Sequence, residues 1–222
     1  MIPLRSSERI YGQTPAIIGL IAVNILFFLY EVSLGRQMDF FLETWGILPD
    51  LIARRPYTLL TSMYLHGGWM HLGGNMLFLW VFGRNVEDRI GSRNLLILYT
   101  LSGLAAAAIH VLANPYSRVP TVGASGAIAG VMGAYLIKFW KTDIDTLFWL
   151  IFLWRMSVPA PYLLLYWFVV QFFSGLGSLS EVDYTGGGVA WFAHVGGFVA
   201  GVGLIRLFRD IRQIPRPWHE VE

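Results

Sequence analysis

Long apolar runs broken by short charged segments are the feature that most constrains what this chain can fold into. Apolar residues make up 55% of the 222 residues, and charged residues only 14%. A membrane-spanning helix needs roughly 20 mostly apolar residues, so about six spans fit and no room is left for a soluble domain of ordinary size. We therefore predict an all-α polytopic membrane protein, with residues 1–222 as one membrane domain and its core at about 15–210.

The charged segment before the first run lacks a clear small-residue cleavage pattern. We therefore expect the first span to be retained rather than removed as a signal peptide. The six expected spans are Pro15–Leu34, Leu72–Val86, Leu95–Ala113, Ser125–Trp140, Pro159–Leu176 and Val189–Phe208.

Two connections between these spans are more than linkers. Gly35–Gly68 is long and mixes aromatic residues and prolines with short apolar stretches, which predicts a structured loop in the membrane interface. Lys141–Val158 contains Leu147–Trp154, an apolar stretch too short to span, for which we expect a re-entrant or surface segment.

The sixteen Lys and Arg residues fall unevenly on the two sides of this topology. By the positive-inside rule, the richer side is cytoplasmic, which predicts a cell-membrane protein with both termini in the cytoplasm. Because these residues flank spans, they indicate anchoring at membrane lipids rather than nucleic-acid binding. The richer side holds Arg5, Arg9, Arg84, Arg89, Arg93, Lys138, Lys141, Arg155, Arg206, Arg209, Arg212 and Arg216, and the other side holds Arg36, Arg54, Arg55 and Arg118.

Polar side chains in the second, fourth and sixth spans are expected at a similar depth in the membrane. These spans run from the outer face inward, so His71, Asn75, Ser125 and His194 each lie near the outer end of a helix. At 1.5 Å per residue, the fourth span is about 24 Å long and the stretch from His194 to Phe208 about 22 Å, both shorter than the roughly 30 Å hydrocarbon core. Ser125 and His194 should therefore lie at similar depth, below the outer surface.

Small residues at four-residue spacing predict close contact between the fourth and sixth spans. Gly126 and Gly130 form one ridge, and Gly197 and Gly201 form the other. Such ridges commonly serve helix packing alone, but here each also accompanies one polar residue. Packing them together would bring Ser125 within hydrogen-bonding reach of His194.

A serine beside a histidine suggests nucleophilic catalysis. A hydroxyl becomes a useful nucleophile when a neighbouring base accepts its proton, and histidine can do so near neutral pH. The prediction is a Ser125–His194 dyad, because the carboxylates nearest these helices fall at span ends or in loops. These are Glu87, Asp88, Glu181 and Asp183.

His71 and Asn75 are four residues apart and should share one helix face. With the backbone amide of Ser125 at its helix start, they could hold the oxyanion formed when a carbonyl is attacked. The alternative is that they make packing hydrogen bonds only.

Three segments together resemble the signatures of the rhomboid family of intramembrane serine proteases. They are His66-Gly67-Gly68-Trp69-Met70-His71-Leu72-Gly73-Gly74-Asn75, Gly123-Ala124-Ser125-Gly126, and Ala193-His194-Val195-Gly196-Gly197 with Gly201. Their order, spacing and placement agree across about residues 15–210.

This resemblance implies a six-helix core that cleaves transmembrane protein substrates without a metal or organic cofactor. Carried over by position, Ser125 is the nucleophile, His194 the general base, and His71 and Asn75 the oxyanion donors. The resemblance also implies that Glu87 and Arg89 form a structural polar cluster, that the first loop is embedded in the membrane, and that the fifth span moves aside for substrate.

The sequence departs from this pattern at two places. Some members place an aromatic residue four positions after the nucleophile, against the catalytic histidine, and here that residue is Ala129. The first loop also contains no adjacent Trp-Arg pair, since Trp154-Arg155 belongs to the cytoplasmic side.

Two other functions fit parts of the sequence. A metal-dependent membrane hydrolase or carrier could use His66, His71 and His194, although no HExxH motif accompanies them. A non-catalytic relative that binds membrane clients would share the fold, but would more usually lack the serine or histidine. His66 and His110 are otherwise expected to be a loop hydrogen-bond partner and a packing residue. The absence of cysteine excludes disulfides, thiolate metal sites and a cysteine nucleophile.

Overall fold

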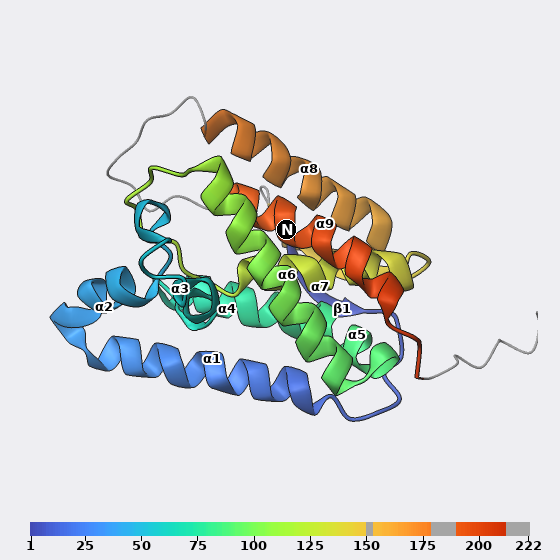
Figure 1. Ribbon diagram of the computed structural model, residues 1–222. Coiled ribbons are helices and arrows are strands. Elements are labelled where there is room, and N and C mark those ends of the chain that lie inside the picture. Colours follow the sequence, from blue (N-terminus) through green and yellow to red (C-terminus); the bar gives the residue numbers. More distant parts are fainter. Residues whose placement is uncertain (150–152, 179–189, 212–222) are drawn as a thin grey trace, which may run out of the picture.

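The computed structural model describes residues 1–149, 153–178 and 190–211, which form a body of helices (Figure 1) and one small sheet. Some residues discussed above lie outside these ranges. They are Val189 at the start of the sixth expected span, Glu181, Asp183, Arg212 and Arg216.

Helices occupy each of the six expected spans within the described ranges. The second is divided by a π-helical stretch, η4 (Leu79–Gly83), into α4 (Trp69–Phe78) and α5 (Arg84–Ile90). Of the described helices, two are long and apolar enough to cross a membrane, and α7 to α9 are shorter apolar helices. The other helices are α1 (Pro15–Ser33), α6 (Ser92–Ala113), α7 (Ser125–Lys138), α8 (Ala160–Ser178) and α9 (Trp191–Leu204), with η5 (Ile205–Leu207) after α9.

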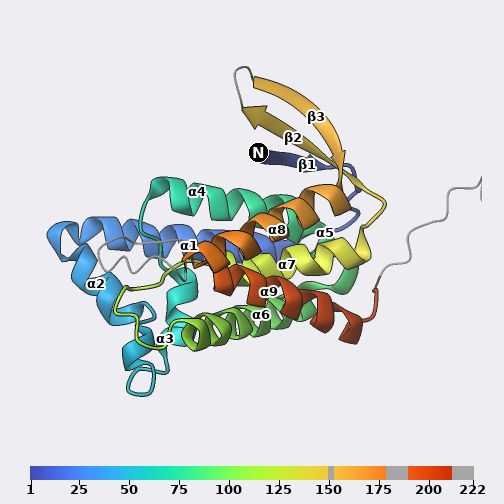
Figure 2. The same cartoon turned by 90° about the horizontal axis from the view of Figure 1, so that it is seen from above.

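Helix α7 is the centre of the core. Every residue of α7 from Gly126 to Tyr135 is buried, because α6, α8, α9 and η4 all pack against it (Figure 2). The small side chains of this helix allow its neighbours to approach closely. Since Ser125 is the first residue of α7, the position of the predicted nucleophile is set by the most buried helix of the described chain.

The two glycine ridges pack against each other. A Cβ on Gly197 would lie 2.0 Å from the Gly126 carbonyl oxygen, and one on Gly201 would lie 1.8 Å from that of Gly130. Real Cβ atoms do not approach an oxygen so closely, so only glycine fits at these two positions of α9. The expected contact between the fourth and sixth spans is therefore present, at backbone level.

The first loop is structured, as expected, and consists of short helical pieces. These are η1 (Gly35–Gln37), α2 (Met38–Trp45), η2 (Pro49–Leu51), α3 (Thr58–Thr61) and η3 (Ser62–Tyr64). The loop joins the segment that precedes α7, because Ile47 and Thr121 exchange backbone hydrogen bonds and the Gly123 amide donates to the Ser62 carbonyl. The loop therefore helps to fix the position of the chain segment that leads into Ser125.

A three-stranded antiparallel sheet corrects the all-α prediction. It consists of β1 (Ile2–Ser6), β2 (Asp143–Trp149) and β3 (Leu153–Pro159) in that order, and it lies to one side of the helices (Figure 2). Of the segment Leu147–Trp154, expected to be re-entrant or on the surface, residues 147–149 lie in β2 and residues 153–154 in the mostly exposed strand β3. Its described residues therefore form a surface segment rather than a re-entrant one, and residues 150–152 lie outside the described ranges. Ile144 and Thr146 of β2 are buried while the intervening Asp145 is not, which is the period-two pattern of a strand.

The sheet is attached to the helices at the C-terminal end of α7. The Ser6 hydroxyl and the Tyr135 hydroxyl are 2.6 Å apart, and Tyr135 also bonds to Thr142 at 2.9 Å. Strand β3 continues directly into α8, and the Ala160 amide donates to the Thr142 carbonyl. The first turn of α8 is thereby fixed to the sheet.

Charged residues meet at the same end of the molecule. Glu87 is buried and accepts hydrogen bonds from the Ala16 and Ile17 amides, which satisfies otherwise unpaired donors at the start of α1. Arg89 bonds to Asp210, and so does Lys138. Glu87 and Arg89 thus hold helix ends together, a structural role that matches the expectation.

Candidate active site

The structure places Ser125 and His194 in direct contact. The Ser125 Oγ and the His194 Nε2 are 2.7 Å apart, although the residues are 69 positions apart in sequence. Ser125 begins α7, and His194 lies in the first turn of α9. The glycine contacts between these helices bring the two side chains together.

A residue that the sequence analysis did not identify holds the other side of the histidine ring. The Gln171 Oε1 lies 2.5 Å from the His194 Nδ1, and both side chains are buried. A carbonyl oxygen only accepts, so the imidazole Nδ1 donates. In the neutral ring, Nε2 is then the acceptor, and it faces the Ser125 hydroxyl.

His71 and Asn75 lie against Gly123, two residues before Ser125. A Cβ on Gly123 would be 2.7 Å from the His71 Nε2 and 3.6 Å from the Asn75 Nδ2. Gly123 also has φ +128°, a conformation that residues with a side chain rarely adopt. The absence of a side chain here leaves room for the His71 ring, while Asn75 would be at ordinary contact distance, and both lie beside the start of the helix that carries Ser125.

His66, in the loop before α4, forms a hydrogen bond with Asn75. The Asn75 Nδ2 donates to the His66 Nε2 over 3.0 Å, and the His66 amide donates to the buried Glu31 carboxylate. Burial, and secondarily the neighbouring His71, lowers the pKa of His66 to about 4, so the ring is neutral near pH 7 and can accept this bond. His66 is thus a loop hydrogen-bond partner, as expected, and its partner is a predicted site residue.

The remaining histidine of the described helices is not near a metal-binding group. His110 bonds to the Thr121 hydroxyl at 2.9 Å. Across residues 1–149, 153–178 and 190–211, no three His, Asp or Glu side chains come together in a way that could hold a metal ion.

Comparison with known sequences identifies the family of this fold. The sequence model described as the rhomboid domain matches residues 53–210, which include all three signature segments. The chain belongs to the rhomboid family. Membrane-protein character follows from this membership and from the apolar helices.

Its relatives include a protein named as a protease and one named as inactive. The rhomboid protease GluP of Bacillus subtilis is 40% identical over 52% of this chain and 23% of its own length. The chloroplastic rhomboid-like protein 11 of Arabidopsis thaliana is 29% identical over 83% of this chain and 65% of its own length. The inactive rhomboid protein 1 of Drosophila melanogaster is 30% identical over 50% of this chain and 8% of its own length. The chain thus spans less than two thirds of each of these relatives.

In this rhomboid, the aromatic partner of the histidine comes from another helix. Ala129 offers no ring, but the Trp167 ring of α8 lies 5.7 Å from the His194 ring between centroids, at an interplanar angle of 37°. Trp191 approaches edge-on from α9 itself, at 6.5 Å. Since α8 carries both Trp167 and Gln171, it contributes two of the contacts of His194.

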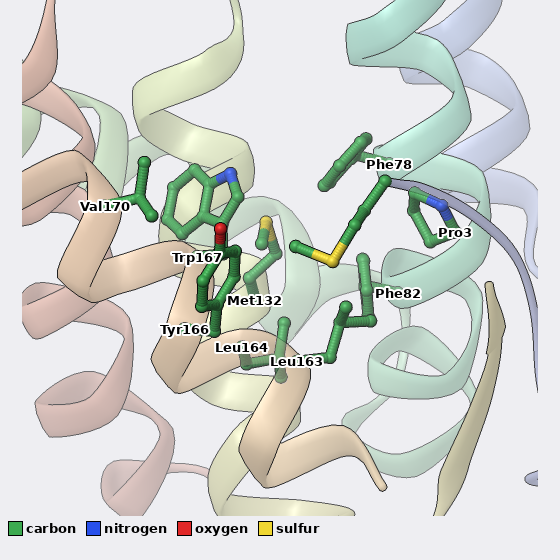
Figure 3. A pocket seen from close by; sticks show the side chains of 10 residues that line it. Pro3, Phe78, Phe82, Met132, Leu163, Leu164, Tyr166, Trp167 and Val170 are labelled. Carbon is green, nitrogen blue, oxygen red and sulfur yellow. The ribbon is translucent and has the colours of Figure 1, made fainter. Parts of the chain in front are cut away.

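Trp167 also borders an apolar cavity of about 180 Å³ between α8, η4, α7 and the N-terminal strand (Figure 3). Phe78 and Phe82 line one side, and Leu163 and Val170 line the other. A second cavity, of about 30 Å³, adjoins Ser125 itself and has room for one or two water molecules. A peptide segment requires more space than either provides.

Proposed function

We propose that this rhomboid is an intramembrane serine endopeptidase that cleaves transmembrane protein substrates near the outer part of the bilayer. The observation that carries this proposal is the 2.7 Å contact between the Ser125 Oγ and the His194 Nε2. A hydroxyl and an imidazole are costly in an apolar helix bundle, and their direct pairing is the arrangement that nucleophilic catalysis needs.

In the proposed reaction, His194 takes the Ser125 proton as the hydroxyl attacks the scissile carbonyl, and later returns it to the leaving amine. His71 and Asn75, with the backbone amide of Ser125, stabilise the oxyanion. Water then releases the acyl group from Ser125. Each step uses side chains, backbone amides and water, so the proposed reaction requires no cofactor.

The proposed topology has six spans and both termini in the cytoplasm of the cell membrane. The ion pairs of Arg89 and Lys138 with Asp210 lie at the C-terminal end of α7, and the Arg118–Asp50 pair lies in the loops at its N-terminal end. This separation supports the assignment from charge asymmetry. With α7 only 14 residues long, or about 21 Å, Ser125 lies recessed relative to a roughly 30 Å hydrocarbon core.

Replacing the proposed nucleophile tests the function directly. We expect Ser125→Ala to abolish cleavage of a model transmembrane substrate in liposomes, and wild-type protein to form an adduct with a fluorophosphonate that mass spectrometry maps to Ser125. The matched control is Ser33→Ala at the exposed end of α1, where the hydroxyl bonds only locally to the Tyr30 carbonyl, and this variant should cleave normally.

The cleavage assay and the fluorophosphonate labelling also distinguish a protease from a non-catalytic relative that binds membrane clients. A non-catalytic protein would cleave nothing and would take up no probe at Ser125. A chelator addresses the metal-dependent alternative, because it should leave cleavage by a serine enzyme unchanged. Unaltered cleavage by Ser125→Ala would refute the assignment.

A further inference from the structure

Helix α8 holds the proposed base from the side opposite the nucleophile. Trp167 and Gln171 are four residues apart, so they project from the same face of α8 on successive turns. Trp167 lies against the His194 ring, and Gln171 bonds to its Nδ1. The base therefore has contacts from three helices, although it resides on only one of them.

The bond from His194 to Gln171 selects one tautomer of the imidazole. With the proton held on Nδ1, the lone pair of Nε2 points at the Ser125 hydroxyl, which is the form a general base needs. Without an acceptor at Nδ1, the ring could carry its proton on Nε2 and would then be unable to accept from Ser125. A serine protease triad uses a carboxylate for this task, and here a neutral amide occupies the position.

The neutral amide suits its surroundings. Gln171 is only 7% exposed, and His194 is 8% exposed. A buried carboxylate would need a charge partner in this apolar setting, whereas a buried amide needs only hydrogen bonds. Gln171 thus orients the imidazole without placing a charge among the helices.

Trp167 constrains the ring by contact rather than by hydrogen bonding. Its ring also packs near Phe198 of α9, at 6.2 Å between centroids. The neighbouring Phe168 lies 5.0 Å from the same Phe198 ring. These aromatic contacts fix α8 against α9 directly beside His194.

We propose that Gln171, assisted by Trp167, is a positioning residue that sets the tautomer and orientation of His194, so that the dyad is competent only while α8 is seated against α9. This inference rests on the proposed function. It assigns to α8 a part in the catalytic geometry in addition to any part in admitting substrate.

Two substitutions at Gln171 test the proposal. Gln171→Met keeps the length of the side chain but removes the acceptor, and we expect cleavage to slow by about 10- to 100-fold, with fluorophosphonate labelling of Ser125 slowed in parallel. Gln171→Glu keeps a hydrogen-bond acceptor at Nδ1 of His194, so this variant should cleave substrate faster than Gln171→Met does. Because a carboxylate at Nδ1 stabilises the imidazolium, the acidic limb of its pH–rate profile should move to higher pH.

The control is Phe173→Met, an equivalent change on the exposed face of the same helix, which should leave both rates and the pH profile unchanged. Labelling of Gln171→Met at the wild-type rate would overturn the proposal, as would an acidic limb of Gln171→Glu that coincides with the wild type. If Gln171→Met fails to fold, the pH profile of Gln171→Glu decides alone.

These outcomes are distinguishable from a failure of the proposed function. If Ser125→Ala still cleaves, the protease assignment itself is wrong. If Ser125→Ala is inactive while Gln171→Met is fully active, the protease assignment stands and only the role of Gln171 is withdrawn.

Discussion

Asn75 has two amide hydrogens on Nδ2, and one of them is committed to His66. The second is the one that we assign to the oxyanion, beside Gly123. This division explains why an amide suits the position better than a hydroxyl. One hydrogen fixes the side chain, and the other is left to act on the substrate.

Removing this amide should slow the reaction without abolishing it. We expect Asn75→Ala to lower kcat by about 10- to 1000-fold, with the loss of about 100- to 1000-fold known for a single oxyanion donor as the upper part of this range, and with Ser125 and His194 still in contact. Asn114→Ala is the control, because that amide bonds to the His110 carbonyl at the end of α6. A wild-type kcat for Asn75→Ala would require the oxyanion role to be withdrawn.

The buried His66 predicts an acid-sensitive fold. Its pKa is lowered from 6.5 to about 4, so between these values the unfolded chain binds a proton that the folded chain does not. Stability is therefore retained above pH 6.5 and lost progressively as the pH falls toward 4. His66→Gln keeps an acceptor for Asn75 but does not titrate, so the melting temperature in detergent should fall less steeply with acid. Equal slopes for the two proteins would contradict this account.

The position of a site residue could be predicted where it depends on the sequence within a few residues of it. The positions of Ser125 and His71 in the first turns of their helices, and of Asn75 one turn after His71, follow from the apolar runs and from spacing that is visible in the sequence. Gln171 was not predicted because the third member of a catalytic serine site is usually a carboxylate, and an amide in an apolar run is usually a packing residue. Its presence among the apolar residues of Pro159–Leu176 was the available signal. That it faces His194 depends on the rotation of α8, which no local pattern specifies.

Among the helices, the contact of α7 with α9 tolerates the least change. We expect Gly201→Ala to destabilise the protein by about 3 kcal/mol or more, because the added methyl would meet the Gly130 backbone, which cannot move aside as a side chain can. Gly203→Ala, two residues along the same helix, adds a methyl with nothing within 4 Å and should change stability by about 1 kcal/mol or less. Thermal unfolding in matched detergent compares the two, and similar melting temperatures would contradict the interlocked packing.

The sheet could not be predicted as the helices were. The strand pattern in β2 extends over only a few residues before it merges into an apolar run, and Leu150, Ile151 and Phe152 between the strands include no turn-forming residue. The third strand is supplied by Ile2–Ser6, about 140 residues away in the chain. Pairing over such a distance leaves no periodic signal, whereas each helix carries its own.

At the scale of the whole molecule, α8 has two structural roles. It holds His194, and with α4 and η4 it encloses the apolar cavity of about 180 Å³ (Figure 3). A helix with its side chains is about 10 Å across, so a substrate helix does not fit this space as it stands. We therefore expect substrate to enter by a limited widening between α4 and α8 that does not break the contact of Gln171 with His194.

A cross-link across the cavity tests this route. The chain has no cysteine, so Phe78→Cys with Val170→Cys creates one reactive pair, on opposite sides of the cavity. Bridging them with a short bifunctional thiol reagent should block cleavage of a transmembrane substrate but preserve fluorophosphonate labelling of Ser125. Each single-cysteine variant treated with the reagent is the control. Undiminished cleavage by the bridged enzyme would exclude entry between these helices.

The paired glycine contacts also determine how the molecule responds to bilayers of different thickness. Two contacts between backbone atoms, four residues apart on each helix, prevent α9 from sliding along α7, and a slip of one turn would displace His194 from Ser125 by about 5.4 Å. A thinner or thicker bilayer can tilt this pair only as a unit. The distance from hydroxyl to imidazole should therefore change little with lipid composition, and we expect any lipid sensitivity of the proposed activity to arise outside this helix pair, at helices such as α8.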